Sequence, residues 1–318
     1  MKYTTLGASR LEVSRVCLGT MNFGRHTTTA EAHDILDEAH ALGINYIDTA
    51  NRYGTPGRPH AAEEILGEWF AQGGSRRDRT VLATKVFERT DDWPNHEGLS
   101  ALNIRRACDA SLRRLNTDRI DIYQMHHIDR AAPWDEVWEA FDVLRQQGKI
   151  LYAGSSNFAG WHLAVAQASG EAHRQRLITE QSVYSLAVRD IEREVQPAAV
   201  ALGIGLVPWS PLAGGLLADV TPGGRRADAE FAARAALHAD RLAATRTLAS
   251  EMGVTLAVLA LSWVASRPGV AAPIVGPRTV AQLRELAQVA DVTLPGHVVE
   301  RLDVLWPGPG VAPEAYAW

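Results

Sequence analysis

The sequence predicts an α/β fold, a (β/α)8 TIM barrel with an N-terminal β-hairpin. Eight short apolar runs alternate along the chain with segments whose apolar residues recur at the three- and four-residue spacing of a helix. Several of these helical segments end in a glycine directly before the next apolar run, as in ALG-INY and QQG-KI. Eight strand–helix units are the number that closes a parallel barrel.

The first predicted element is a hairpin over about residues 1–14, where YTTL and LEV flank a turn containing Gly7. Clear helical patterns occur at 30–43 and 102–115, and a helix and tail end the chain at about 295–318. The eight predicted barrel strands are VCLG (16–19), INYID (44–48), TVLATKV (80–86), IDIYQMH (120–126), ILYAGSS (150–156), LITEQ (177–181), IGLVPWS (204–210) and AAPIVG (271–276).

We expect one domain over residues 1–318, because no linker-like segment divides the chain. A doubly wound sheet is the alternative arrangement of strand–helix units. It is disfavoured because no G-x-G-x-x-G follows the first strand and no G-x-x-x-x-G-K-[ST] occurs in the sequence.

Composition narrows the class of protein. The 318 residues are 46% hydrophobic and 22% charged, with a formal net charge of −5, so a general nucleic-acid binder is not expected. Cys17 and Cys108 lack CxxC spacing, which disfavours a disulfide framework or a zinc ribbon. The polar N-terminus is unlike a signal peptide, and the apolar run at 256–265 is too short for a membrane span and predicts a core helix. We therefore expect a cytoplasmic protein without a membrane partner, and its oligomeric state is left open.

Polar residues occur where the predicted strands end, which is where barrels carry their function. Asp48 follows the second strand, Lys85 lies in the third, His126 ends the fourth, and Tyr53 lies in the loop after Asp48. Lys85 is one of only three lysines and is surrounded by apolar residues. A nearby ammonium should lower the pKa of a phenol, and an aspartate beside it should keep that ammonium charged. Such a group suits proton transfer coupled to hydride arrival.

Each of these residues also has a simpler interpretation. Asp48 could cap a helix, Tyr53 could be a turn aromatic, and Lys85 could be a charge on an edge strand. His126 and His127 suggest a metal, but neighbouring strand residues point to opposite faces, so no metal site is expected. The joint order of the four residues favours the catalytic interpretation.

Eight segments together resemble the aldo-keto reductase superfamily, in the right order and over nearly the whole chain. They are LGTMNFG (18–24), DTANRYG (48–54), ATKV (83–86), YQMH (123–126), GSSNF (154–158), QSVYSL (181–186), PWSPLAGGLL (208–217) and IVGPRTVAQL (274–283). The resemblance implies reversible reduction of aldehydes or ketones to alcohols with NADPH. It makes Tyr53 the general acid, with Asp48 and Lys85 tuning it and His126 orienting the substrate oxygen.

The same resemblance implies a set of cofactor contacts. Trp209 would stack on the nicotinamide, and Arg278, at a helix start after Gly276, would bind a 2′-phosphate, which favours NADPH over NADH. Trp209 as simple core packing and Arg278 as a solvated charge are the alternatives. The implied cofactor residues are Gly19, Thr20, Met21, Ser156, Asn157, Gln181, Trp209, Ser210, Pro211, Leu212, Gly214, Leu216, Gly276, Arg278, Thr279, Gln282 and Glu285. The expected walls of the substrate pocket are the C-terminal tail with Phe23, Arg52, Phe87, Trp93 and His127.

The chain departs from the family pattern in two places. Leu286 stands where many members carry a polar residue near the adenine, and TPGRPH at 55–60 replaces a shorter loop. Two other functions are alternatives to the reductase. One is a nicotinamide-binding regulatory subunit with negligible turnover, since some relatives of this family pair with membrane channels. The other is a metal-dependent hydrolase, which needs several ligands on one face that the sequence does not offer.

Overall fold

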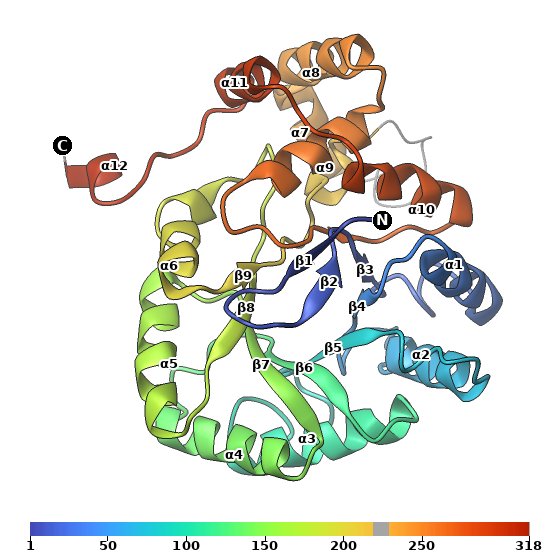
Figure 1. The fold of residues 1–318 in the computed structure, drawn as a ribbon, viewed down its shortest axis with the longest axis vertical. Coiled ribbons are helices and arrows are strands. Elements are labelled where there is room, and N and C mark those ends of the chain that lie inside the picture. The colour runs from blue at the N-terminus through green and yellow to red at the C-terminus, as the bar shows by residue number, and fades with distance from the viewer. Residues whose placement is uncertain (219–228, 318) are drawn as a thin grey trace.

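The computed structural model describes residues 1–218 and 229–317, in which parallel strands form a barrel ringed by helices (Figure 1). The eight strands of the main sheet follow the order β10-β3-β4-β5-β6-β7-β8-β9. Their bounds are β3 Cys17–Gly19, β4 Tyr46–Asp48, β5 Val81–Val86, β6 Ile120–Met125, β7 Ile150–Ser156, β8 Leu177–Gln181, β9 Gly205–Leu206 and β10 Ile274–Val275.

The two edge strands of this sheet, β9 and β10, are joined through β9 and the segment that precedes β10. Leu206 forms a parallel bridge with Val270, and the Ala271 N–H donates to the Leu206 carbonyl at 2.8 Å. Further along the same two segments, the Ile274 N–H donates to the Pro208 carbonyl at 2.9 Å. The sheet is therefore closed, and the predicted (β/α)8 barrel is confirmed.

Helices separate the strands along the chain, as the apolar spacing predicts. Those around the barrel are α1 Thr29–Ala41, α2 Ala61–Ala71, α3 Ala101–Arg114, α4 Trp134–Gln146, α5 Gly160–Ala172, α6 Val195–Leu202, α9 Leu256–Ser266 and α10 Val280–Ala287. Additional helices are α7 Ala229–Leu237, α8 Ala239–Glu251, α11 Gly296–Leu305 and α12 Glu314–Ala317, with short 3-10 turns at Asp190–Glu192, Ala213–Gly215 and Gln288–Ala290. Residues 219–228, in the connection that follows Trp209, lie outside the described residues.

Local sequence explains where several helices begin and end. Thr28 caps α1 in a reciprocal pair with Glu31, and the Ser100 hydroxyl accepts from the Asn103 N–H at the start of α3. Thr255 caps α9 in the same way. Gly203 ends α6 with φ of 67°, a left-handed conformation that glycine adopts without steric cost.

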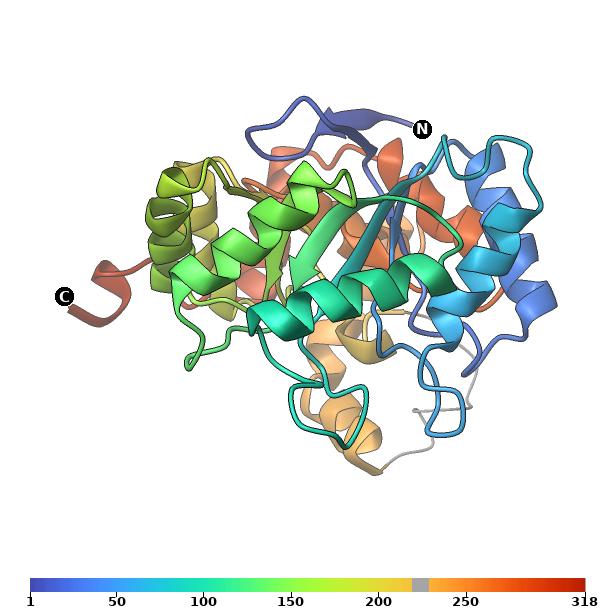
Figure 2. The same cartoon turned by 90° about the horizontal axis from the view of Figure 1, so that it is seen from below.

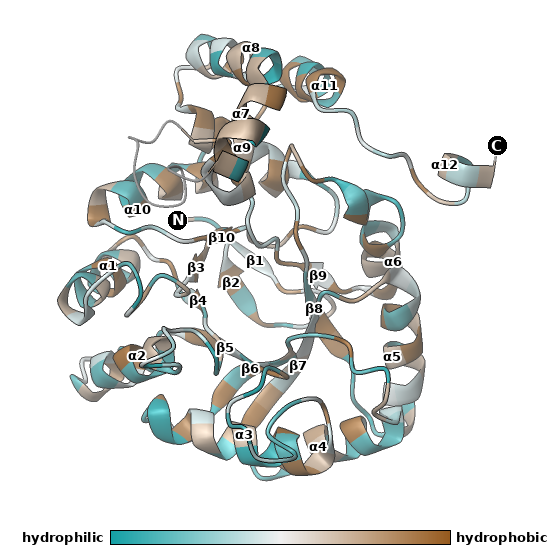
Figure 3. Cartoon of the chain, turned by 180° about the vertical axis from the view of Figure 1, so that it is seen from behind, coloured by the Kyte–Doolittle hydropathy of each residue, from teal (hydrophilic) through white to brown (hydrophobic). Residues whose placement is uncertain are grey.

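Alternating side chains along the strands produce two apolar layers. Cys17, Tyr46, Ala83 and Ile122 belong to the smaller cluster inside the barrel, and a larger cluster fills the space between sheet and helices. The segment 256–265 is buried throughout, which confirms the predicted core helix α9. Figure 3 shows hydrophilic and hydrophobic bands alternating on α3, α4 and α5, as expected for helices with one face against the sheet.

The N-terminal hairpin covers one end of the barrel. β1 Tyr3–Thr5 pairs antiparallel with β2 Glu12–Ser14, which confirms the predicted hairpin. Gly7 in its turn has φ of 55°, and a Cβ there would lie 2.3 Å from the Ile178 carbonyl oxygen, so only glycine fits. Figure 2 shows the hairpin at one end and long loops at the opposite end, where the strands finish.

Within the described ranges, no single helix is both long and apolar enough to cross a membrane. α8 and α9 meet the criteria of length and composition as a pair, but they are bent by 89° where they join.

Candidate active site

A buried lysine joins the strand ends of β4 and β5. Lys85 Nζ donates to Asp48 Oδ2 at 2.6 Å, to the Thr49 carbonyl at 2.8 Å and to the Tyr53 hydroxyl at 3.1 Å. The exposed fractions of the Lys85 and Asp48 side chains are 0% and 2%. An ammonium has three donors, and here all three have acceptors, so the orientation of Lys85 is fixed.

The pKa values of Lys85 and Tyr53 are both raised, so both groups keep their protons at neutral pH. Burial by itself lowers the pKa of Lys85, but the Asp48 carboxylate and Tyr53 outweigh it and the pKa is raised. Burial raises the pKa of Tyr53, and the Lys85 ammonium opposes this only in part. The expectation that the ammonium would leave the phenol with a lowered pKa is therefore wrong in net effect. Tyr53 holds its proton at neutral pH.

His126 lies beside Tyr53 at the end of β6. Its backbone N–H donates to the Val86 carbonyl at 2.9 Å, and its ring centroid is 6.0 Å from that of Tyr53 at an interplanar angle of 77°. Burial, with Lys85 and His127 adding to it, lowers the pKa of His126 to about 3. The imidazole is therefore neutral and has one N–H to offer to an oxygen.

A second group of polar side chains is linked to the first. Gln181 Nε2 donates to Asp48 Oδ1 at 2.9 Å, and the Ser156 hydroxyl donates to the Gln181 carbonyl at 2.8 Å. Asn157, with φ of 60°, donates through Nδ2 to the His126 carbonyl at 3.1 Å and accepts from Trp209 Nε1 at 3.1 Å. The ends of β4, β6, β7 and β8 are thus held in one hydrogen-bonded array.

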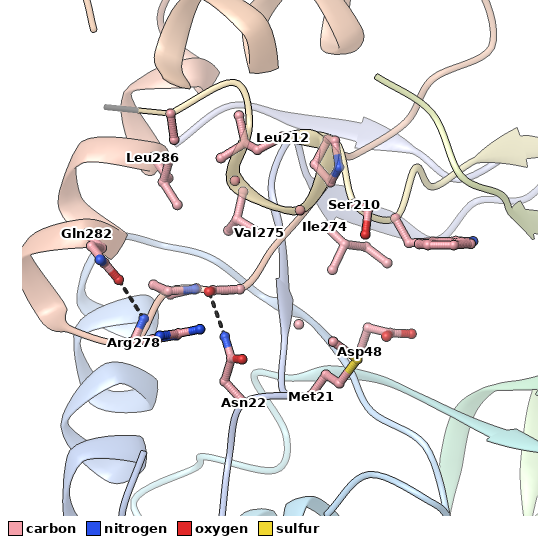
Figure 4. A pocket seen from close by; sticks show the side chains of 18 of the residues that line it. Met21, Asn22, Asp48, Ser210, Leu212, Ile274, Val275, Arg278, Gln282 and Leu286 are labelled. Atoms are coloured by element: carbon pink, nitrogen blue, oxygen red, sulfur yellow. Dashed lines mark hydrogen bonds between the residues drawn. The ribbon is translucent and has the colours of Figure 1, made fainter. Parts of the chain in front are cut away.

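These residues open onto a cavity of about 540 Å³, within the range of small-molecule sites. In Figure 4, Asp48 lies toward one end of this cavity, while Arg278 and Gln282 lie at the other. The predicted residues along its wall are Gly19, Met21, Asp48, Tyr53, His126, Ser156, Asn157, Gln181, Trp209, Ser210, Pro211, Leu212, Gly214, Gly276, Arg278, Gln282 and Glu285.

Hydrogen bonds shape the end of the cavity near α10. The Asn22 amide donates to the Gly276 carbonyl at 2.8 Å, and the Arg278 N–H donates to Gln282 Oε1 at 2.8 Å (Figure 4). No ion pair joins the Arg278 guanidinium to another residue in the described part of the chain. This end therefore presents a cation beside the start of a helix.

Sequence comparison identifies the chain's relatives. The model of the Aldo/keto reductase family matches residues 15–307. The chain belongs to this family. Its Bacillus subtilis (strain 168) relative, "Uncharacterized oxidoreductase YrpG", is 50% identical over 100% of both chains. "Versiconal hemiacetal acetate reductase" of Aspergillus parasiticus is 30% identical over 95% of this chain and 96% of its own length. "Probable voltage-gated potassium channel subunit beta" of Arabidopsis thaliana is 33% identical over 99% of this chain and 100% of its own length. The chain is thus an oxidoreductase enzyme of a family that binds a nicotinamide cofactor.

Four of the predicted functional residues do not line the cavity of this aldo-keto reductase. Lys85 is fully buried beneath Tyr53, and Thr20 is buried with its hydroxyl donating to the Asp48 carbonyl at 3.1 Å. Leu216 is buried in the outer core, and Thr279 caps α10 by accepting from the Gln282 N–H. These residues support the wall instead of forming it.

The predicted substrate walls are corrected in part. Phe23 has no exposed surface and packs in the layer between sheet and helices, so its assignment to the pocket is wrong. The other four, Arg52, Phe87, Trp93 and His127, are not among the residues that line the cavity. Trp93 is 75% exposed, and Phe87 packs against His127 with ring centroids 5.4 Å apart.

Several wall residues of this aldo-keto reductase were missed in the sequence. Ile274, Val275 and Pro277 belong to the segment that carries Arg278, so its motif was an available signal. Ala257 lies in the core helix α9, and its local sequence carries no signal of a place at the cavity. Leu286, the position that departs from the family pattern near the adenine, also lines the wall, and so does Gly215 in the loop that follows Trp209. The other wall residues without a sequence prediction are Asn22 and Ala218. Among the described residues, no three His, Cys, Asp or Glu side chains are grouped so that they could hold a metal ion.

Proposed function

We propose that this enzyme reduces aldehydes or ketones to alcohols with NADPH, reversibly, and that Tyr53 is the proton donor. One observation carries the proposal. A phenol at the cavity wall is hydrogen-bonded to a buried ammonium, which is in turn paired with a carboxylate. This arrangement gives a proton a defined source at the place where a carbonyl oxygen would gain negative charge.

When bound, the nicotinamide supplies the hydride that reduces the carbonyl carbon. Tyr53 donates its hydroxyl proton to the carbonyl oxygen, and the Lys85 ammonium at 3.1 Å stabilises the phenolate that remains. Asp48 keeps Lys85 charged throughout. The neutral His126 ring donates an N–H that orients the same oxygen. In the reverse direction the Tyr53 phenolate accepts the alcohol proton.

The residues of the cavity fit the cofactor at both ends. Asn157 Oδ1 and Gln181 Oε1 keep acceptor capacity for the amide hydrogens of a carboxamide, beside the partly buried Trp209 ring. Arg278 lines the cavity beside the N-terminus of α10, and a guanidinium there would bind a 2′-phosphate, which supports NADPH over NADH. Both cysteines are free and buried, as suits the reducing cytoplasm in which we place the enzyme.

The test is the loss of NADPH absorbance at about 340 nm with 4-nitrobenzaldehyde, with NADH run in parallel. We expect turnover that is faster at limiting NADPH than at limiting NADH. The Tyr53→Phe variant should lose about a hundredfold or more in kcat, since it removes the proton donor. NADPH binding, measured by quenching of tryptophan fluorescence, should be unchanged. Full activity of Tyr53→Phe would refute the assignment of the acid.

A second function is favoured by two of the relatives. Proteins of Arabidopsis thaliana and Oryza sativa subsp. japonica that are 33% and 34% identical are named probable voltage-gated potassium channel beta subunits. By this alternative the chain is a nicotinamide-binding regulatory subunit with negligible turnover. Tight NADPH binding without turnover on a panel of aldehydes and ketones would support it, and rapid turnover would exclude it.

A further inference from the structure

A second glutamine holds the carboxylate of Asp48 from inside the barrel. Gln124, on β6, donates from Nε2 to Asp48 Oδ1 at 3.2 Å, and Gln181 on β8 donates to the same oxygen at 2.9 Å. Asp48 Oδ2 faces Lys85. The Gln124 side chain has no exposed surface, so its action on the reaction must pass through Asp48.

The orientation of the Gln124 amide follows from chemistry. A carboxylate only accepts hydrogen bonds, so the NH2 group of the amide must face Asp48. The Gln124 Oε1 atom is buried and hydrogen-bonds to none of the described residues. An amide that is half satisfied in an apolar interior costs stability. As a filler of the barrel, an apolar side chain of similar size would serve better than Gln124.

A glycine on the neighbouring strand leaves room for the Gln124 side chain. Gly154 on β7 faces Gln124, and a Cβ at Gly154 would lie 3.0 Å from Gln124 Cγ and 2.6 Å from Thr179 Cγ2. Any larger residue at 154 would displace one of the two side chains. The position of the Gln124 side chain therefore depends on Gly154 in the neighbouring strand.

We propose that Gln124 is a positioning residue that sets the proton affinity of Tyr53 through Asp48 and Lys85. The proposal rests on the function proposed above. By donating to Oδ1, Gln124 withdraws charge from the carboxylate and keeps Oδ2 directed at the ammonium. Without that donor, Asp48 neutralises more of the Lys85 charge, and the ammonium favours the phenolate less. Tyr53 then holds its proton more tightly.

The other titratable groups around this site do not obscure the effect. Burial raises the pKa values of Cys17 and Tyr46 well above their ordinary range, and it lowers that of His126 to about 3. These three stay neutral between about pH 6 and pH 9. Glu180 is behind the wall, bonded to Ser155 and Ser182, and burial raises its pKa to about 7. A profile of Glu180→Gln identifies any contribution from that carboxyl.

The experiment is the pH dependence of kcat for alcohol oxidation with NADP+, in which Tyr53 acts as the base. In Gln124→Leu we expect the apparent pKa to rise by about one unit, with kcat about tenfold lower on the acidic side. The Kd for NADP+ should be unchanged. A lower kcat with an unmoved apparent pKa would overturn the proposal, because a purely structural role predicts that result.

Gln124→Glu tests the same idea without removing the polar group. Next to Asp48 the new carboxyl group is kept protonated at low pH by burial and by the like charge, so it still donates to Oδ1. We expect nearly wild-type kcat at about pH 6 and a new ionisation above it, at which kcat falls. A profile without this additional ionisation would contradict the proposal.

Gln175 offers a matched control. It is also a buried glutamine, 8% exposed, whose Nε2 donates to a carboxylate, Asp142 Oδ1, at 2.9 Å, and it precedes β8 at the opposite end of the barrel. Gln175→Leu should lower the melting temperature and leave the apparent pKa of kcat unmoved. If Tyr53→Phe behaves as predicted but Gln124→Leu leaves the profile unshifted, only the role of Gln124 fails. If Tyr53→Phe keeps its activity, the proposed function fails.

Discussion

The pair formed by Lys85 and Asp48 makes the sharpest prediction about stability. Both side chains are buried, at 0% and 2% exposed, and their charged atoms lie 2.6 Å apart. At an effective dielectric constant of about 20, Coulomb's law gives an attraction of about 6 kcal/mol at that distance. Much of this only offsets the loss of hydration of two buried charges.

Removing one partner leaves that cost uncompensated. Lys85→Met and Asp48→Asn should therefore each lower the free energy of unfolding by about 3–5 kcal/mol. The double variant removes both charges and should cost about as much as one single variant, so the coupling energy in the cycle should be about 3 kcal/mol or more. Urea denaturation of the wild type, the two single variants and the double variant, all at one pH, measures the free energies of unfolding that give the coupling energy.

Additive effects of the two substitutions would refute this reasoning, because they would mean that neither charge depends on the other. Arg89 and Glu97 provide the matched control. They form a two-pronged ion pair at 2.7 and 3.0 Å, but both side chains are 54% exposed. Their double-mutant cycle should show little coupling, since exposed pairs are screened by water and salt.

Three further substitutions probe other parts of the fold. Because burial raises the pKa of Glu180 to about 7, the folded state binds its proton more tightly than the unfolded state does. Wild-type stability should therefore fall by about 3 kcal/mol as the pH rises from about 4.5 to about 7 and then level off, and Glu180→Gln should remove most of that fall in urea titrations. Gly67→Ala should destabilise by about 1–3 kcal/mol, because its Cβ would lie 2.0 Å from the Arg114 carbonyl oxygen where α2 meets α3. Gly296→Ala, with open space around it, should leave the melting temperature nearly unchanged.

The strand ends could be predicted from the sequence because their positions follow from local pattern and chain order. Asp48, Lys85 and His126 lie at the ends of consecutive strands, and parallel neighbours bring such ends together. The predicted strand at 204–210 is shorter in the structure, as β9 Gly205–Leu206. Pro208 has no N–H to donate, which limits the ladder there.

Properties that depend on distant neighbours could not be predicted in this way. The raised pKa of Tyr53 results from burial by several segments, which a motif does not record. Phe23 lies in the same loop as Met21. Phe23 packs into the apolar layer between sheet and helices, while Met21 is 41% exposed and lines the cavity. Gln124 precedes His126 by two residues, and its contact with Asp48 reaches from β6 past β5 to β4, which the local motif does not record.

The central claim is that Tyr53 delivers the proton when hydride reaches the carbonyl. Single-turnover stopped flow tests it most directly, with enzyme saturated by NADPH and mixed with excess 4-nitrobenzaldehyde while absorbance at about 340 nm is followed. The account predicts a fast phase in the wild type that slows by about a hundredfold or more in Tyr53→Phe, at equal affinity for NADPH. Equal single-turnover rates in the two proteins would contradict it.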